Sequence, residues 1–242
     1  MLLPLMCSGM NICGFLRMSM NEWIKDHPLY LLLALGTMLS AGWLIKNRAK
    51  LRIKTWVAVL LAVLHTLVGV VFVKVFAFLE GNEFGAMSLF GGVFFMPLLY
   101  LLGAKLFRRK AGDVCDVFTP CMIVTLMLAR VNCLFAGCCK GNAIPFITDR
   151  TVCWPTREAE IVFYLTLLAW LFLRVRKGRL IPGTAYPIYM AAYGAFRFII
   201  EFFRESNSPT IFHIAHLWAV LSFCIGLAVY GEIRRKKGIR RR

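Results

Sequence analysis

The segment VFTPCMIVTLMLARVNCLFAGCC, residues 117–139, is a long apolar run with one arginine, Arg130, in its interior. Residues 186–203, YPIYMAAYGAFRFIIEFF, repeat this arrangement with Arg197 and Glu201. A charged side chain at the centre of a membrane costs about 2.5–3.5 kcal/mol on insertion scales. These three side chains are therefore expected to face a protein interior and to meet charged or polar partners there.

The composition places these segments in an integral membrane protein. Of the 242 residues, 60% are hydrophobic, and several apolar runs approach the length that spans a membrane as a helix. The runs do not alternate as barrel strands do, so an all-α polytopic bundle is expected. Seven transmembrane helices are predicted, at residues 28–45, 56–79, 87–106, 115–136, 158–173, 184–203 and 213–231.

The bundle is expected to be one domain, residues 27–242, because no long polar linker or repeat interrupts it. Residues 1–26 are apolar but lack a basic start and a clear cleavage site, which argues against a signal peptide. We expect an extracytoplasmic segment there. An upstream extension, with the true start at Met18 or Met20, is the alternative.

The net charge of +17 follows the topology of the chain. Loops at residues 80–85 and 204–210 carry little positive charge, whereas every second loop and the C-terminus are basic. This alternation predicts an extracytoplasmic N-terminus and a cytoplasmic C-terminus. It favours anionic lipid over nucleic acid as the partner of the basic residues. The basic clusters are residues 46–54, 108–110, 174–179 and 234–242.

The predicted topology places the buried charges in the outer half of the membrane. At 1.5 Å per residue, Arg130 and Arg197 lie about 20 Å along spans that start at the cytoplasmic face. Arg204 is expected on the same helix face as Arg197 and Glu201. A cavity for an anionic headgroup follows, because guanidinium groups bind phosphate in a bidentate manner and stay protonated. In the structural alternative, Arg197 and Glu201 neutralise each other and Arg130 lacks a partner.

Two histidines are further candidates for the site. His27 stands at the outer end of the first span, and His65 lies within the second span. Either one is a possible ligand of the substrate or a base. For His65 a purely structural role is an equally good interpretation.

The cysteines predict no metal site. Nine are present, but neither paired CxxC spacing nor nearby histidines accompany them, so no metal or other cofactor is expected. Cys138 and Cys139 form an adjacent pair close in sequence to Arg130. Positive charge lowers the pKa of a thiol, so one of them is a candidate nucleophile. The alternative is a pair of small loop residues.

Four motifs resemble those of the prolipoprotein diacylglyceryl transferase family, over most of the chain from residue 28 onward. The segment PGTAYPIYMAAYGAFRFIIEFFRE is similar to the family's YGxxRFxxEFxR element, and ARVNCLFAGCCKG to its signature loop. GAMSLFGG resembles its MSFHGG motif, and WPTREAEIVFY resembles its HPSQLYE-type element, with Pro155 and Glu160 kept.

The resemblance implies a transferase of the bacterial inner or plasma membrane. It would move the diacylglyceryl group of phosphatidylglycerol to the lipobox cysteine of a preprolipoprotein. By motif, Arg130 and Arg197 would contact the phosphate and Glu201 would orient Arg197. Gly137 and Gly141 would shape the loop, and Arg204 and Cys138 would bind substrate.

The chain also departs from the family's motifs. Phe90 stands where the family has a histidine, and Cys133 and Cys138 replace its asparagine and glutamate. Trp154 and Arg157 replace a histidine and a glutamine. A divergent branch is implied, and a base other than that histidine is then required. The alternative is a lipid-binding membrane protein that has lost the chemistry or has a different specificity.

Overall fold

The computed structural model describes residues 28–81, 87–144, 152–205 and 212–239, so His27 and the predicted N-terminal segment lie outside the described residues. Within these ranges the chain is helical apart from isolated bridges and connecting turns. One helix corresponds to each predicted span, with ends that differ from the prediction by up to eight residues. The helices are α3 (Pro28–Leu51), α4 (Thr55–Leu79), α5 (Phe90–Leu106), α6 (Ala111–Ala136), α7 (Thr156–Arg176), α8 (Ala185–Glu201) and α9 (Ile214–Ile239).

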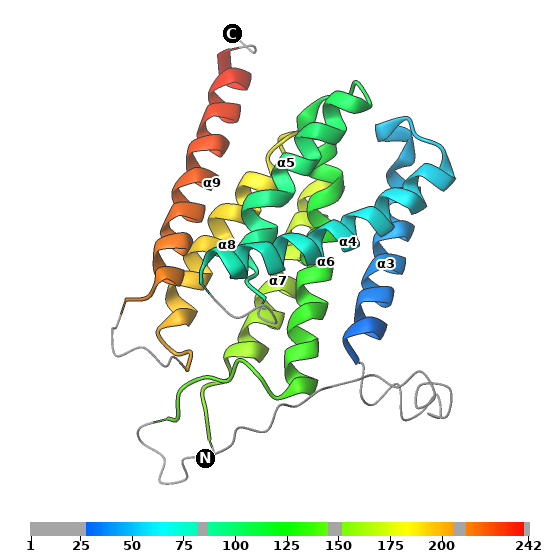
Figure 1. Cartoon of the computed structure of the whole chain (residues 1–242). Helices are drawn as coiled ribbons and strands as arrows, with labels where there is room; N and C mark the ends of the chain where they lie inside the picture. The colour runs from blue at the N-terminus through cyan, green and yellow to red at the C-terminus, as the bar shows by residue number, and fades with distance from the viewer. Residues whose placement is uncertain (1–27, 82–86, 145–151, 206–211, 240–242) are drawn as a thin grey trace, which may run out of the picture.

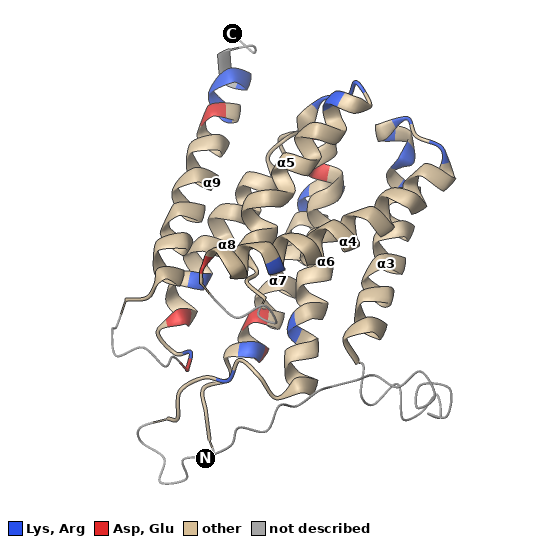
Figure 2. Ribbon diagram, in the orientation of Figure 1, with Lys and Arg blue, Asp and Glu red and all other residues tan. Residues whose placement is uncertain are grey.

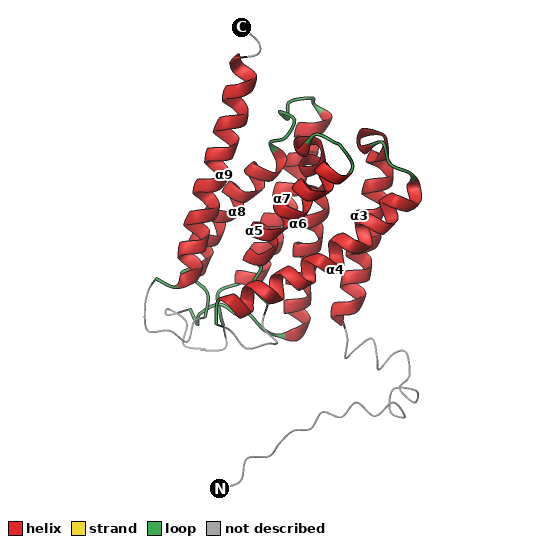
Figure 3. Ribbon diagram, turned by 45° about the horizontal axis from the view of Figure 1, so that its top comes forward, coloured by secondary structure: helices red, strands yellow, loops and turns green. Residues whose placement is uncertain are grey.

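Most of the helices run up and down a single bundle, and α4 crosses it obliquely (Figures 1 and 3). Helix α6 packs against α3, α5, α7 and α8, which makes it the central element. Lysines and arginines gather at the end of the bundle where α3, α5 and α7 terminate (Figure 2). The connection from α6 to α7 lies at the opposite end.

Four helices, α3, α4, α6 and α9, are long and apolar enough to cross a membrane. Helix α5 is apolar but has only 17 residues. Helices α7 and α8 contribute charged side chains to the interior. The described part of the chain is therefore a helical, multi-pass membrane protein.

Close backbone contacts hold the helices together at glycines. A Cβ atom at Gly194 of α8 would lie 2.5 Å from the carbonyl oxygen of Ala219 in α9. At Gly91, in the GAMSLFGG motif, it would lie 2.2 Å from the carbonyl oxygen of Phe72 in α4. The glycine at position 91 thus serves close helix approach, one of the roles that small residues have in membrane bundles.

The start of α8 is fixed by a carboxylate from α6. Asp116 accepts hydrogen bonds from the backbone N–H of Gly183, at 2.5 Å, and of Ala185, at 2.9 Å. These are donors that a helix N-terminus leaves unpaired. The contact ties α8 to α6 at the end remote from Arg197 and Glu201.

We predict that Gly194→Ala destabilises the bundle, because the added methyl group forces α8 away from α9. Overpacking of this kind costs about 1–3 kcal/mol. Thermal unfolding of the purified protein in detergent measures the effect. The matched control is Gly103→Ala, since a Cβ atom at Gly103 meets no atom within 4 Å. Equal melting temperatures for the two variants would contradict the prediction.

Candidate functional site

A buried ion network joins three helices at the end of the bundle opposite the basic loops. The carboxylate of Glu160 in α7 pairs through Oε2 with Arg130 of α6 and through Oε1 with Arg197 of α8, the latter at 2.7 Å. A second Arg197 nitrogen lies 2.7 Å from Oε2 of Glu201. The four side chains are 4–10% exposed. The structure thus brings Arg130, Arg197 and Glu201 together.

One part of the sequence analysis is wrong here. Under the structural alternative Arg130 was expected to have no partner, and Glu160 supplies one. Glu160 was noted only as part of a motif and was not assigned to the site. Its signal was its position near the start of the predicted span at residues 158–173, where a carboxylate precedes an apolar run.

Arg204 contacts the network, but not from the helix face on which it was predicted to lie. Helix α8 ends at Glu201, so Arg204 does not continue the helix face. It lies after a turn and forms an antiparallel bridge with Gly141. From there its Nη1 lies 3.9 Å from Glu201 Oε2, and its Nη2 donates to Cys139 Sγ at 3.3 Å.

Several polar atoms around the network have no hydrogen-bond partner among the described residues. They include Nε of Arg197 and the hydroxyl groups of Tyr164 and Tyr193. The two tyrosine rings stack with centroids 6.2 Å apart. Arg130 is an electrostatic neighbour of both tyrosines, and Arg197 is one of Tyr193. Buried polar groups without partners call for an explanation, and a polar ligand is one.

The network carries an excess of cationic groups. It contains the guanidinium groups of Arg130, Arg197 and Arg204 and the carboxylates of Glu160 and Glu201. A low-dielectric site with one unbalanced positive charge favours an anion. Arginine forks suit phosphate in particular.

Two glycines shape the loop that follows α6. Gly137 ends the helix in the left-handed conformation, with φ of 66°. At Gly141 a Cβ atom would lie 2.3 Å from the carbonyl oxygen of Trp154, so only glycine fits. Backbone contacts hold the loop against Phe203 and Arg204.

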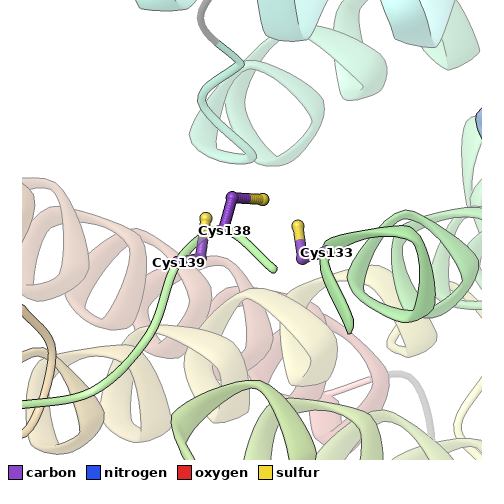
Figure 4. Close-up of side chains that lie close together, drawn as sticks. All are labelled: Cys133, Cys138 and Cys139. Atoms are coloured by element: carbon purple, nitrogen blue, oxygen red, sulfur yellow. The ribbon is translucent and has the colours of Figure 1, made fainter. Parts of the chain in front are cut away.

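Three cysteines meet where α6 ends. Sγ atoms of Cys133, Cys138 and Cys139 lie within 4.8 Å of one another, and Figure 4 shows the three side chains converging. Cys133 was predicted only as a substituted motif position and not as a neighbour of the pair, because it lies on the helix and only the turn at Gly137 brings the pair back to it. A hydrogen bond from the Cys133 thiol, with Arg204 and Arg130 nearby, lowers the pKa of Cys139 to about 4.

His65 lies apart from the ion network. Its Nε2 is 2.9 Å from the hydroxyl of Tyr100, and its ring stacks on the same tyrosine. Its surroundings also include Phe118. The geometry fits the structural interpretation of His65 and gives no contact with Arg130 or Arg197.

A carboxyl group that the sequence analysis did not consider lies near the network. Glu80 follows the last residue of α4 and has Arg197, Glu201 and Ser88 among its electrostatic neighbours. Burial raises the pKa of Glu80 above its ordinary value. A carboxyl group of this kind is a candidate proton acceptor at a site that has no histidine at position 90.

A separate apolar cavity of about 880 Å³ lies between α3, α6 and α7. It reaches Lys50 and Asp113 near the basic end of the bundle. Its lining, which includes Leu39, Leu168 and Phe172, suits hydrocarbon and not a charged headgroup. The cavity is therefore distinct from the arginine site.

Comparison with known proteins gives one family. The profile of the prolipoprotein diacylglyceryl transferases matches residues 28–231. A phosphatidylglycerol–prolipoprotein diacylglyceryl transferase of Dehalococcoides mccartyi strain CBDB1 is 24% identical over 206 residues, which are 73% of this chain and 77% of that protein. Enzymes of the same name from Leptothrix cholodnii and Clostridium tetani are 27% identical over 143 residues (51% of this chain, 52% of that protein) and 24% identical over 146 (54% and 58%).

The fold and site define a multi-pass helical membrane protein with a buried arginine–glutamate centre at one end of its bundle. Within that class, the chain belongs to the prolipoprotein diacylglyceryl transferase family. The resemblance drawn from the sequence motifs is confirmed.

Glu160→Ala is predicted to destabilise the protein strongly, because it leaves Arg130 and Arg197 buried and facing each other without their shared carboxylate. Breaking a buried ion pair from one side costs about 3–5 kcal/mol. Thermal unfolding in detergent measures the loss. Glu158→Ala is the control on the same helix, since the Glu158 side chain is 46% exposed and its ion pair with Arg157 spans 3.6 Å. A small effect at Glu160, similar to that at Glu158, would show that the pairing is not structural.

Proposed function

We propose that the protein transfers the diacylglyceryl group of phosphatidylglycerol to the lipobox cysteine of preprolipoproteins. The observation that supports this most is the buried network of Arg130, Arg197 and Arg204, which pair with only two carboxylates and so leave one positive charge in excess. The family assignment and the names of the relatives point to the same activity.

The reaction needs stabilisation of a phosphate leaving group. The acceptor sulfur attacks the glycerol carbon that bears the phosphate, so that a C–S bond forms and the C–O bond breaks. The thiol proton goes to a base, and glycerol phosphate leaves with the bonding electrons. Guanidinium groups fixed in advance stabilise the charge that develops on the departing phosphate oxygen.

Each network residue has a distinct role in this proposal. Arg130 and Arg197 contact the phosphate, and the two glutamates hold Arg197 in place. Arg204 adds positive charge at the edge of the site, beside Gly141 and Cys139, and Cys138 next to them is a further substrate-binding candidate. Tyr164 and Tyr193 offer hydroxyl groups to the phosphate oxygens.

The proposed topology places this chemistry at the outer face of the bacterial inner or plasma membrane. All seven helices cross the membrane, with the N-terminus outside and the C-terminus in the cytoplasm. The basic residues at one end of the bundle support this orientation through the positive-inside rule (Figure 2). The ion network lies at the opposite end, where preprolipoproteins emerge.

Glu80 is the proton acceptor that we propose in place of the family's histidine. Phe90 occupies that histidine's position and packs 5.7 Å from Tyr193, so an inert ring borders the arginine network. Glu80 supplies a carboxylate in the same region. Family membership does not favour the alternative, a lipid-binding protein without activity.

Arg130→Ala and Arg197→Ala are each predicted to abolish transfer, because the leaving phosphate then loses its cationic partner. Loss of one such donor costs about 10²–10³-fold in rate. The assay follows radiolabelled phosphatidylglycerol into a lipobox peptide with purified, correctly inserted protein. Arg176→Ala, an exposed arginine at the basic end, is the control. Wild-type turnover by either buried variant contradicts the assignment.

Glu80→Gln is predicted to lower the rate by about 10²–10⁴-fold, the usual contribution of a general base. In the wild type the rate rises with pH through the raised pKa of Glu80, because the group must be deprotonated to accept a proton. That rise is lost in the variant and partly restored in Glu80→Asp. A pH–rate profile checks this, with Glu232→Gln, in the exposed C-terminal part of α9, as control. An unchanged profile excludes Glu80 as the base.

A further inference from the structure

The three cysteines are arranged as the ligands of a metal site are. Cys133 stands on the last turns of α6, and Cys138 and Cys139 follow the turn at Gly137. Their three Sγ atoms lie within 4.8 Å of one another. Three sulfur atoms around one metal ion at about 2.3 Å are separated from each other by about 4 Å, so only a small contraction is needed.

The backbone that carries the thiols is held in place independently of them. Cys139 adopts the left-handed conformation, with φ of 57°. Nη1 of Arg157 donates to the carbonyl oxygens of Cys133 and Cys138, each at 3.4 Å, and so bridges the helix to the loop. Thr156 donates to the carbonyl oxygen of Cys139 at 3.3 Å. The start of α7 therefore fixes all three cysteines.

Positive charge lies beside the cluster. Arg204 donates to Cys139 Sγ, and Arg130 lies in the electrostatic neighbourhood of Cys133 and Cys139. Positive charge of this kind offsets the negative charge that three thiolates bring to one ion. Cys138 is exposed, which leaves a path for a metal ion from solvent.

We propose that Cys133, Cys138 and Cys139 bind one thiophilic metal ion, Cu(I), through three thiolates. Thiolate ligands select soft ions, among them Cu(I) and Zn(II). Structural zinc sites in proteins are closed by four ligands, whereas the described residues bring three Sγ atoms together here. The three-sulfur set therefore fits a monovalent copper ion better. Bound metal would clamp the loop of residues 137–141 to the end of α6, beside the ion network.

The test is a copper titration of the full-length protein, purified in detergent under reducing, anaerobic conditions. Cu(I) is supplied in competition with bathocuproine disulfonate, and the chelator's absorbance reports the metal that the protein takes. One Cu(I) per chain is expected, with three sulfur neighbours in X-ray absorption. Bound copper is also expected to raise the unfolding temperature, because it binds the folded state.

Variants link the binding to these residues. Cys133→Ser and Cys139→Ser are each expected to weaken copper binding by at least about tenfold, as loss of even a supporting group does at metal sites. Cys224→Ser, which removes an exposed thiol on α9, is expected to leave it unchanged. Size-exclusion elution and helical circular dichroism of each variant confirm that it remains folded.

Three outcomes would overturn the proposal. One is undiminished copper binding when all three cysteines are replaced by serine. Another is a parallel titration in which Zn(II) is bound in preference to Cu(I), which would rule out the monovalent ion. The third is a disulfide between two of the cysteines in protein isolated anaerobically from membranes, found by mass mapping.

Discussion

One carboxylate shared by two buried arginines organises the interior of this protein. Glu160 stands between Arg130 and Arg197 and so links α6, α7 and α8 at a single point. Neither arginine is stable in an apolar bundle without a partner, and Glu201 supplies Arg197 with a second carboxylate at 2.7 Å. The third cationic group of the network is Arg204, which is 24% exposed and lies 3.9 Å from Glu201 at the edge of the buried part.

In this network, the side chains that link the helices are also the ones proposed to bind the phosphate. Guanidinium groups fixed by carboxylates are already oriented before a phosphate arrives, which is the condition for electrostatic catalysis in a dry site. The free hydroxyl groups of Tyr164 and Tyr193 add hydrogen-bonding capacity where the charge is. The close packing of α8 on α9 at Gly194 fixes the position of the helix that carries Arg197.

The departures from the family's motifs cluster around this network. Phe90 packs beside Tyr193, and Cys133 and Cys138 meet Cys139 at the end of α6. The chain therefore has the cationic centre, whereas the motif positions around it carry an aromatic ring and thiols in place of the family's polar and titratable side chains. Glu80 and the cysteine cluster are the further reactive groups near the site.

The sequence by itself determined the helices and the importance of Arg130, Arg197 and Glu201, because a charge inside an apolar run is costly wherever the run is buried. The sequence also identified the family, because four of its motifs occur in order along the chain. Only the tertiary structure decided which groups pair. Glu160 was noted only as a motif residue and proved to pair with both arginines. Arg204 lies beyond the end of the helix that its spacing suggested, and Cys133 joins the other thiols through the turn at Gly137. Spacing along one helix fixes local neighbours, whereas partners on different helices depend on how the helices pack.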